Sequence, residues 1–253
     1  MLLLLQAGFI FVRLQNRTPS SLPRMKAVVL AMLLLTAARP ATAQTRFNAA
    51  LKHELDSIST VDQRWRVMLF DPHIARRPDS LAAALGVTRK KLNRYLGRQM
   101  AQTDSTNQVR ITAVLKQYGY PGTTLVGEPT NETAWLVVQH SNDIDRYLPL
   151  IKKAASKGEL PFYLYAQMLD RQLMHDGKEQ LYGTQGFGYT VTNPATGRHE
   201  RQPPFIWPIK NPQQVNARRQ QAGFTSTVEQ SAASLGIPYR RVTLQDVEKM
   251  PKK

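Results

Sequence analysis

The amino-acid sequence predicts a mainly α-helical fold, namely a compact multi-helix domain with a small β-hairpin appendage near the C-terminal third. Two observations lead to this expectation. Apolar residues recur at intervals of three or four through most of residues 47–173, which is the spacing of amphipathic helices. Turn-forming Gly, Pro and Asn residues interrupt these runs, which is typical of helices joined by short loops.

The helices expected in the first half follow from these stripes. The first helix contains the series Phe47, Leu51, Leu55, Ile58, Trp65 and Leu69. Asp71-Pro72 is expected to end it, because the residue before a proline avoids the helical conformation. A short helix is expected over 79–85, and Thr88 is expected to cap another up to about residue 100. Asp104 or Ser105 is expected to cap a separate helix over 106–118.

The second half of the sequence predicts three further helices, followed by a segment with strand propensity. Asn131 is expected to cap a helix up to about residue 138, and Asn142 or Asp143 to cap the next, up to about residue 155. A third begins at Pro161 and ends near Gly177.

Strand propensity and turn chemistry then predict a β-hairpin near 187–203. One more helix is expected over 211–221. Residues 225–253 are expected to form short helical turns and a basic tail.

The N-terminal residues predict export. Residues 25–43 have the pattern of a signal peptide, with Lys26, an apolar run over 27–38 and a small-x-small site that predicts cleavage after Ala43. A retained membrane anchor is the alternative. Residues 1–24 are interpreted as a mis-called N-terminal extension, or else as part of a longer signal.

The mature chain would then be periplasmic or extracellular and contain no transmembrane helix. Its residues 44–224 are expected to form the helical globular domain.

Composition and charge exclude several classes of protein. The 253 residues contain no cysteine, which excludes a disulfide scaffold, a Cys-based zinc finger and a thiol nucleophile. The motifs HExxH, GxSxG and the P-loop are also absent. The formal net charge is +16, which favours polyanions non-specifically. The basic clusters are short and lack interleaved aromatics, so we expect a solvated basic surface that meets envelope polymers or lipid headgroups, without specific nucleic-acid binding.

Four predicted helices place a polar residue on an apolar stripe. Asp62, Asn107, His140 and Asp170 each occupy a position where an apolar residue is expected. Sites in helical proteins are built from such side chains on facing helices. The alternative is that the four are hydrogen-bonded core residues that pin helices together. One imidazole and two carboxylates could also bind zinc or iron, but their spacing matches no ligand signature, so metal and cofactor stay open.

A family resemblance covers roughly residues 50–224. Its most distinctive parts are Gln139-His140, Asp170-Arg171 and the stretch Gln180-Leu181-Tyr182-Gly183-Thr184-Gln185, which resemble the bacterial domain-of-unknown-function family DUF6624. The chain departs from the family at Tyr120, where Trp is common, and at Ser141, where an acidic residue is common. The resemblance implies domain boundaries and candidate residues, but it implies no activity.

Two functional hypotheses follow. In the first, an exported hydrolase acts on a polar envelope or nutrient substrate: Asp62 and His140 transfer protons, and Asp170 orients His140. In the second, a non-catalytic module binds a small polar or anionic ligand or another envelope component, and the same polar residues recognise it or are structural. Both hypotheses share the expected ligand-binding residues Gln63, Arg66, Asn107, Gln139, Arg171, Tyr182 and Gln185.

Overall fold

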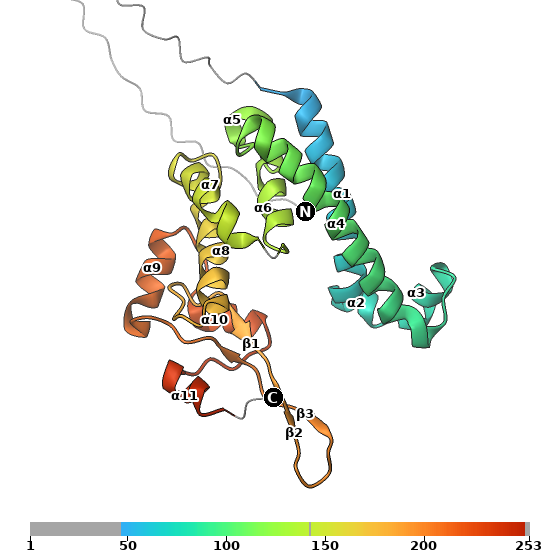
Figure 1. Cartoon of the computed structure of the whole chain (residues 1–253), viewed down its shortest axis with the longest axis vertical. Helices are drawn as coiled ribbons and strands as arrows, with labels where there is room; N and C mark the ends of the chain where they lie inside the picture. Colours follow the sequence, from blue (N-terminus) through green and yellow to red (C-terminus); the bar gives the residue numbers. More distant parts are fainter. Residues whose placement is uncertain (1–46, 142, 251–253) are drawn as a thin grey trace, which may run out of the picture. The chain divides into compact units, whose positions relative to one another are not determined.

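The computed structural model of the protein describes residues 47–141 and 143–250 (Figure 1). These residues form a mainly α-helical fold with two short antiparallel strand pairs, so the predicted fold class is confirmed. The predicted signal peptide at 25–43, residues 1–24 and the candidate cap Asn142 lie outside the described residues, and the predicted domain boundaries stay predictions.

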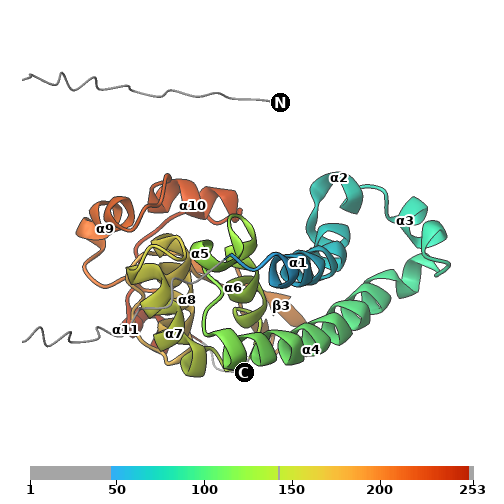
Figure 2. The same ribbon diagram turned by 90° about the horizontal axis from the view of Figure 1, so that it is seen from above.

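Two long helices, α1 (Ala49–Phe70) and α4 (Leu92–Tyr118), lie side by side (Figures 1 and 2). α1 begins where the side chain of Asn48 accepts a hydrogen bond from the backbone of Leu51, and it ends at the expected Asp71. The apolar stripes of the two helices contribute to the main core. Between them the chain forms α2 (Pro72–Ala75), α3 (Pro78–Ala84) and the 3₁₀ turn η1 (Arg89–Lys91).

The two helices expected over 88–100 and 106–118 are one continuous helix, so that prediction is wrong. The side chains expected to cap a second helix make other contacts. The Ser105 hydroxyl donates to the backbone oxygen of Ala101, one turn earlier, and Asp104 pairs with Arg66 of α1. Since the packing against α1 runs through this point, the local preference of Asp and Ser for helix starts does not break α4.

The remaining helices of the main core follow α4. They are α5 (Thr123–Val126), the turn η2 (Thr130–Glu132), α6 (Thr133–Val138), α7 (Ile144–Ser156) and α8 (Phe162–His175). α7 packs along α8, and α6 packs against both α1 and α4. Asn131 is not a helix cap, because its buried amide donates to Thr123 Oγ1 and to the backbone oxygen of Glu159.

The predicted β-hairpin is confirmed. β2 (Thr190–Thr192) pairs with β3 (His199–Arg201), with Thr192 opposite His199. A second antiparallel pair, which the sequence did not predict, joins β1 (Gly186–Phe187) to β4 (Phe205–Ile206). This pair brings the segment after α8 against the segment that contains Trp207.

The C-terminal part consists of the turn η3 (Pro212–Gln214), α9 (Val215–Gln221), α10 (Val228–Ser234) and α11 (Leu244–Glu248). Val228 and Ala232 pack with Ile206 and Val215 in a second core cluster. Among the described residues, no helix combines the length and the apolar character needed to cross a membrane.

Candidate functional site

A partly buried ion-pair cluster joins α1 to α4. The Arg66 guanidinium lies 3.2 Å from Asp62 Oδ2 and 2.8 Å from Asp104 Oδ1. It also donates to the backbone oxygen of Asp62, while the Gln63 amide donates to Asp62 Oδ2. Two carboxylates therefore balance the charge of Arg66, and its donors are largely occupied.

Asn107 lies behind this cluster, and its buried Nδ2 has no hydrogen-bond partner among the described residues. The same holds for Asp62 Oδ1, although only 1 % of each residue is exposed. Burial raises the pKa of Asp62 above its usual value, and Asp104 adds to this effect. Arg66, Gln63 and Asn107 oppose it. The Asn107 side chain thus lies near enough to Asp62 to lower its pKa but forms no hydrogen bond with it, so this contact between α1 and α4 is incompletely satisfied.

α6 ends at Val138, two residues before His140, and His140 is exposed, so the prediction that it points inward from the apolar stripe of a helix is wrong. Partial burial lowers the pKa of this imidazole to about 4, and the positive charges of Arg66 and Arg171 act in the same direction, against Asp104. Because the ring keeps access to solvent, screening limits the effect of these charges. With its pKa lowered, the His140 imidazole is neutral at pH 7. The three charged residues that act on it, Arg66, Asp104 and Arg171, lie on three different helices.

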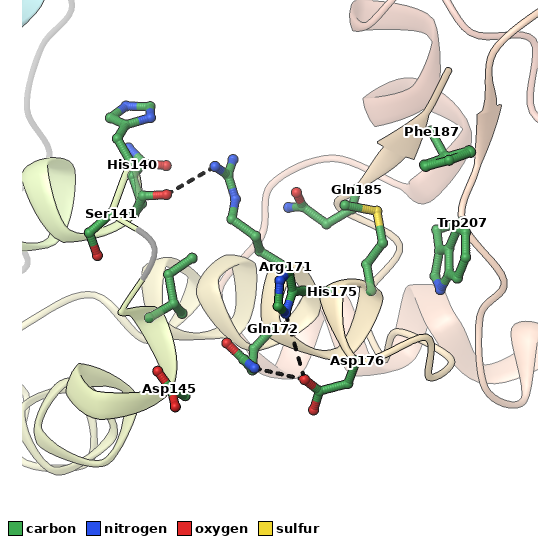
Figure 3. Close-up of a pocket in the computed structure, with 13 residues that line it drawn as sticks. His140, Ser141, Asp145, Arg171, Gln172, His175, Asp176, Gln185, Phe187 and Trp207 are labelled. Carbon is green, nitrogen blue, oxygen red and sulfur yellow. Dashed lines mark hydrogen bonds and ion pairs between the residues drawn. The ribbon is translucent and has the colours of Figure 1, made fainter. Parts of the chain in front are cut away.

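Arg171 extends from α8 toward the segment that carries His140 (Figure 3). It is half-buried, and burial lowers its pKa. Its Nη1 donates to the backbone oxygen of Gln139 at 3.0 Å. In the part of the chain that the structure describes, this is its one hydrogen bond, and no carboxylate forms an ion pair with it. Arg171 thus presents a charge without a counter-ion and several unused donors.

A cleft with a volume of about 990 Å³ lies around Arg171, between the α6–α7 connection, α8 and the β1–β4 pair. Figure 3 shows Gln185 between Arg171 and the aromatic rings of Phe187 and Trp207. The Nε2 atom of Gln185 donates to Thr184 Oγ1 at 3.0 Å. The cleft therefore combines a cationic end with an aromatic end.

A smaller hollow of about 310 Å³ lies beside the cleft. Asp104, Gln108 and Asp143 contribute to its walls, and His140 and Ser141 line both spaces. From the sequence, Asp104 is expected only as a helix cap. Its position three residues before Asn107 places both on one face of α4, which is the signal that could have identified it.

Asp170 belongs to a different network. Its two oxygens accept hydrogen bonds from the backbone N–H groups of Leu181, Tyr182 and Thr184 and from the Thr184 hydroxyl, at 2.7–3.1 Å. Burial raises the pKa of Asp170, while these donors oppose the rise. His140, which Asp170 was expected to orient, is not among these partners.

The remaining candidate residues divide between the two networks. Gln139 lines the cleft, where its backbone oxygen holds Arg171. The Tyr182 ring packs against Phe224 with a centroid distance of 6.0 Å, and Tyr182 does not contribute to the cleft wall. The structure therefore places His140 and Arg171 at one cleft, while Arg66, Asp62 and Gln63 form a separate cluster whose charge still acts on His140. Asn107 lies next to Asp62. Asp170 and Tyr182 lie apart from these residues.

The side chains needed for covalent or metal chemistry are arranged less favourably. The Ser141 hydroxyl donates to the Val138 backbone oxygen, which is not a base that would activate it as a nucleophile. The Thr184 hydroxyl donates to Asp170, whose oxygens already accept hydrogen bonds from three backbone N–H groups. Among the described residues, no group of three or more His, Asp or Glu side chains is arranged to hold a metal ion.

Comparison with known proteins gives a family but no activity. A model of a family of unknown function (DUF6624) matches residues 90–232, more than half of the chain. The match includes His140, Asp170 and Arg171 and excludes the α1 residues Asp62 and Arg66, so it begins later than the resemblance expected from residue 50. Searches of curated proteins and of solved structures found no significant match. The chain belongs to the family of unknown function DUF6624.

Proposed function

We propose that this protein binds a small polar molecule through an anionic group, in the cleft lined by Arg171 and His140. One observation carries the proposal. Arg171 is half-buried, points into the cleft and pairs with one backbone oxygen, without a carboxylate partner among the described residues. A partly desolvated guanidinium without a counter-ion is costly, and a bound carboxylate, sulfonate or phosphate would offset that cost.

Arg66 contributes differently from Arg171. Its guanidinium already contacts Asp62 and Asp104, so it offers few donors to a ligand. Its charge still acts on His140, as the lowered pKa of the imidazole indicates. A ligand anion beside Arg171 would reduce this positive field and allow His140 to take a proton. Arg171 is thus the primary contact, and His140 is a contact that strengthens when the anion is present.

The walls of the cleft limit the ligand class. Phe187 and Trp207 provide an apolar end that suits a ring or a hydrocarbon part. Asp145 and Asp176 also line the cleft, and Asp176 pairs with Lys178 while Asp145 is exposed. Their negative charges disfavour ligands with several anionic groups. The best fit is a molecule with one anionic group and one ring or apolar part.

Benzenesulfonate and its neutral analogue benzenesulfonamide form a matched pair of probes, to be titrated by NMR or calorimetry. We expect the anion to bind and the amide to bind at least about tenfold more weakly, since a hydrogen-bonded charge pair contributes about 1.5–3 kcal/mol. Arg171→Gln should remove the preference for the anion. Lys152→Gln, which removes an exposed charge from α7, should preserve it. Equal affinities for the two probes in the unmodified protein would contradict the proposal.

Hydrolysis is a second candidate, favoured by a neutral imidazole that shares a hollow with Asp104. His140 would accept a proton from a water molecule that attacks the bound substrate. Asp62 is 1 % exposed and does not line either space, so it would position Arg66 rather than touch the substrate. Turnover of ester, amide or phosphate substrates that persists in His140→Ala would refute this role for His140.

We also propose export, on the basis of the signal-peptide pattern at 25–43. The protein produced in a bacterial host should then be recovered outside the cytoplasm with Gln44 at its N-terminus. Mass spectrometry of the intact secreted or periplasmic protein measures this directly. Recovery of the uncleaved chain from the cytoplasm alone would contradict it.

A further inference from the structure

A strongly basic region lies apart from the cleft, at the end of α1 and the beginning of α4. Residues 64–98, called the basic arm below, contain eight exposed arginine or lysine residues and one exposed acidic residue, Asp79. Asp79 faces one of these cations, Arg89, at 3.6 Å. The basic arm therefore carries a large excess of positive charge on its surface.

The basic arm has its own apolar interior, so its cations are held on a defined surface. Trp65, Ala82, Leu92 and Leu96 form a buried cluster that joins α1, α3 and α4. Three exposed cations lie on the opposite side, at Lys91, the last residue of η1, and at Arg94 and Arg98 of α4. Spacings of three and four residues place these three charges on one face of the helix.

Large apolar side chains are also exposed in the basic arm, at the end of α1. Phe70 is 67 % exposed and Val67 is 43 % exposed, and their spacing of three residues places them on one face at the end of α1. Arg76 and Arg77 follow within seven residues and are also exposed. Exposed apolar side chains next to several cations are typical of surfaces that adsorb to anionic lipid: the cations contact headgroups and the apolar groups enter the interface.

We propose that the basic arm docks on a bilayer that contains anionic phospholipid. Its cations contact lipid phosphates, and Phe70 with Val67 inserts among the headgroups. A soluble polyanion would satisfy the charges equally well, but it would leave the exposed phenyl ring in water. The exposed apolar pair therefore favours a lipid surface over a dissolved polymer.

Vesicle sedimentation with the full chain tests this proposal. The protein is mixed with phosphatidylcholine vesicles, with and without phosphatidylglycerol. We expect binding to increase strongly with phosphatidylglycerol and to weaken with salt. The apolar run at 27–38 is common to all variants, so differences between variants report on the arm.

Two variants with the same change in net charge separate the arm from the overall charge of the protein. The arm variant carries Arg77→Gln, Lys91→Gln, Arg94→Gln and Arg98→Gln. The control variant carries Arg198→Gln, Arg201→Gln, Lys210→Gln and Lys249→Gln, at exposed positions outside the arm. Since each cation near a lipid surface changes the affinity by about fivefold, the arm variant should bind more than about tenfold more weakly than the control.

The apolar contact is tested separately by Phe70→Ser, an exposed position where folding should be unaffected. This variant should bind anionic vesicles several-fold more weakly and bind soluble polyphosphate as the unmodified protein does. Equal losses in the arm and control variants, binding that ignores phosphatidylglycerol, or an unchanged vesicle affinity of Phe70→Ser would each overturn the proposal.

Discussion

Asp62 and Asp170 occupy the same kind of position in the sequence and very different positions in the structure. Both lie on the apolar stripe of a helix, and at most 1 % of either residue is exposed. Asp170 accepts hydrogen bonds at both oxygens from a loop that wraps around it. Asp62 has one oxygen satisfied by Gln63 and Arg66 and one without a partner among the described residues.

This difference separates a structural carboxylate from one whose surroundings are incomplete. Asp170 holds the segment Leu181–Thr184 against α8. Its carboxylate is the hydrogen-bond acceptor for three backbone N–H groups that would otherwise have none. Asp62 orients Arg66 on α1, and Arg66 in turn pairs with Asp104 of α4. A buried polar position in a sequence therefore reveals that a network exists, but not whether the network is closed.

The largest effect should come from Asp170→Ala. It leaves three partly buried backbone N–H groups without acceptors, at a cost of about 1 kcal/mol or more for each stranded group, so we expect a loss of roughly 3 kcal/mol. Denaturant unfolding monitored by tryptophan fluorescence measures the loss. Asp170→Asn keeps one acceptor oxygen, so its free energy of unfolding should lie between those of the unmodified protein and of Asp170→Ala. A loss below about 1 kcal/mol would show that the loop does not depend on the carboxylate.

The loop that surrounds Asp170 should be nearly as sensitive at Gly183. This residue has φ = +68°, and an added Cβ would lie 2.5 Å from Val228 Cγ2 and 2.7 Å from Ile209 Cδ1. Gly183→Ala should therefore destabilise the fold by roughly 1–3 kcal/mol through strain and overpacking. Gly197, with φ = +64° and open space around it, is the control for backbone strain alone. Equal melting temperatures for the two alanine variants would exclude the packing effect.

Asp62→Asn should cost much less than either change. Burial already disfavours the charged form of Asp62, and Arg66 retains its partner Asp104 after the substitution. We expect the free energy of unfolding to change by no more than about 1 kcal/mol. The same denaturant measurement compares it directly with Asp170→Asn. If Asp62→Asn were the more destabilising of the two, the distinction between a closed and an open network would be wrong.

The smallest effect concerns pH and the cleft. The pKa of His140 is lowered by burial and by two guanidinium groups, so the free protein disfavours the protonated ring. A bound anion offsets those charges and raises that pKa, so affinity should rise as pH falls from about 7 toward about 5. Benzenesulfonate suits this titration because its own charge stays constant. The dissociation constant should decrease several-fold, and His140→Gln should remove the dependence.

A dissociation constant that ignores pH in the unmodified protein would place His140 outside the binding contact. A pH dependence that persists in His140→Gln would assign the proton to another group. Arg171→Gln is the matched variant here, since it should weaken binding at every pH.

Much of the fold was predictable because local signals agree with the packing. α1, α7 and α8 appear close to where their stripes and end residues place them. The sequence predicts two helices in place of α4, because Asp104 and Ser105 are residues that often cap helices. It does not show that Asp104 pairs with Arg66 of α1 instead. The apolar stripes also identified the buried residues Asp62 and Asn107, because a stripe shows which residues of one helix point inward.

The sequence alone determined the helical class, the excess of positive charge and three of the four predicted inward polar positions, Asp62, Asn107 and Asp170, because these follow from periodicity and composition within short segments. Only the tertiary structure decided which of those residues meet. It joined Arg66 to Asp104, left Arg171 at a cleft with one hydrogen-bond partner among the described residues, and enclosed Asp170 in a loop more than ten residues away. The physical reason is that charge neutralisation and hydrogen-bond satisfaction depend on distances between elements, and no spacing along the chain encodes those distances.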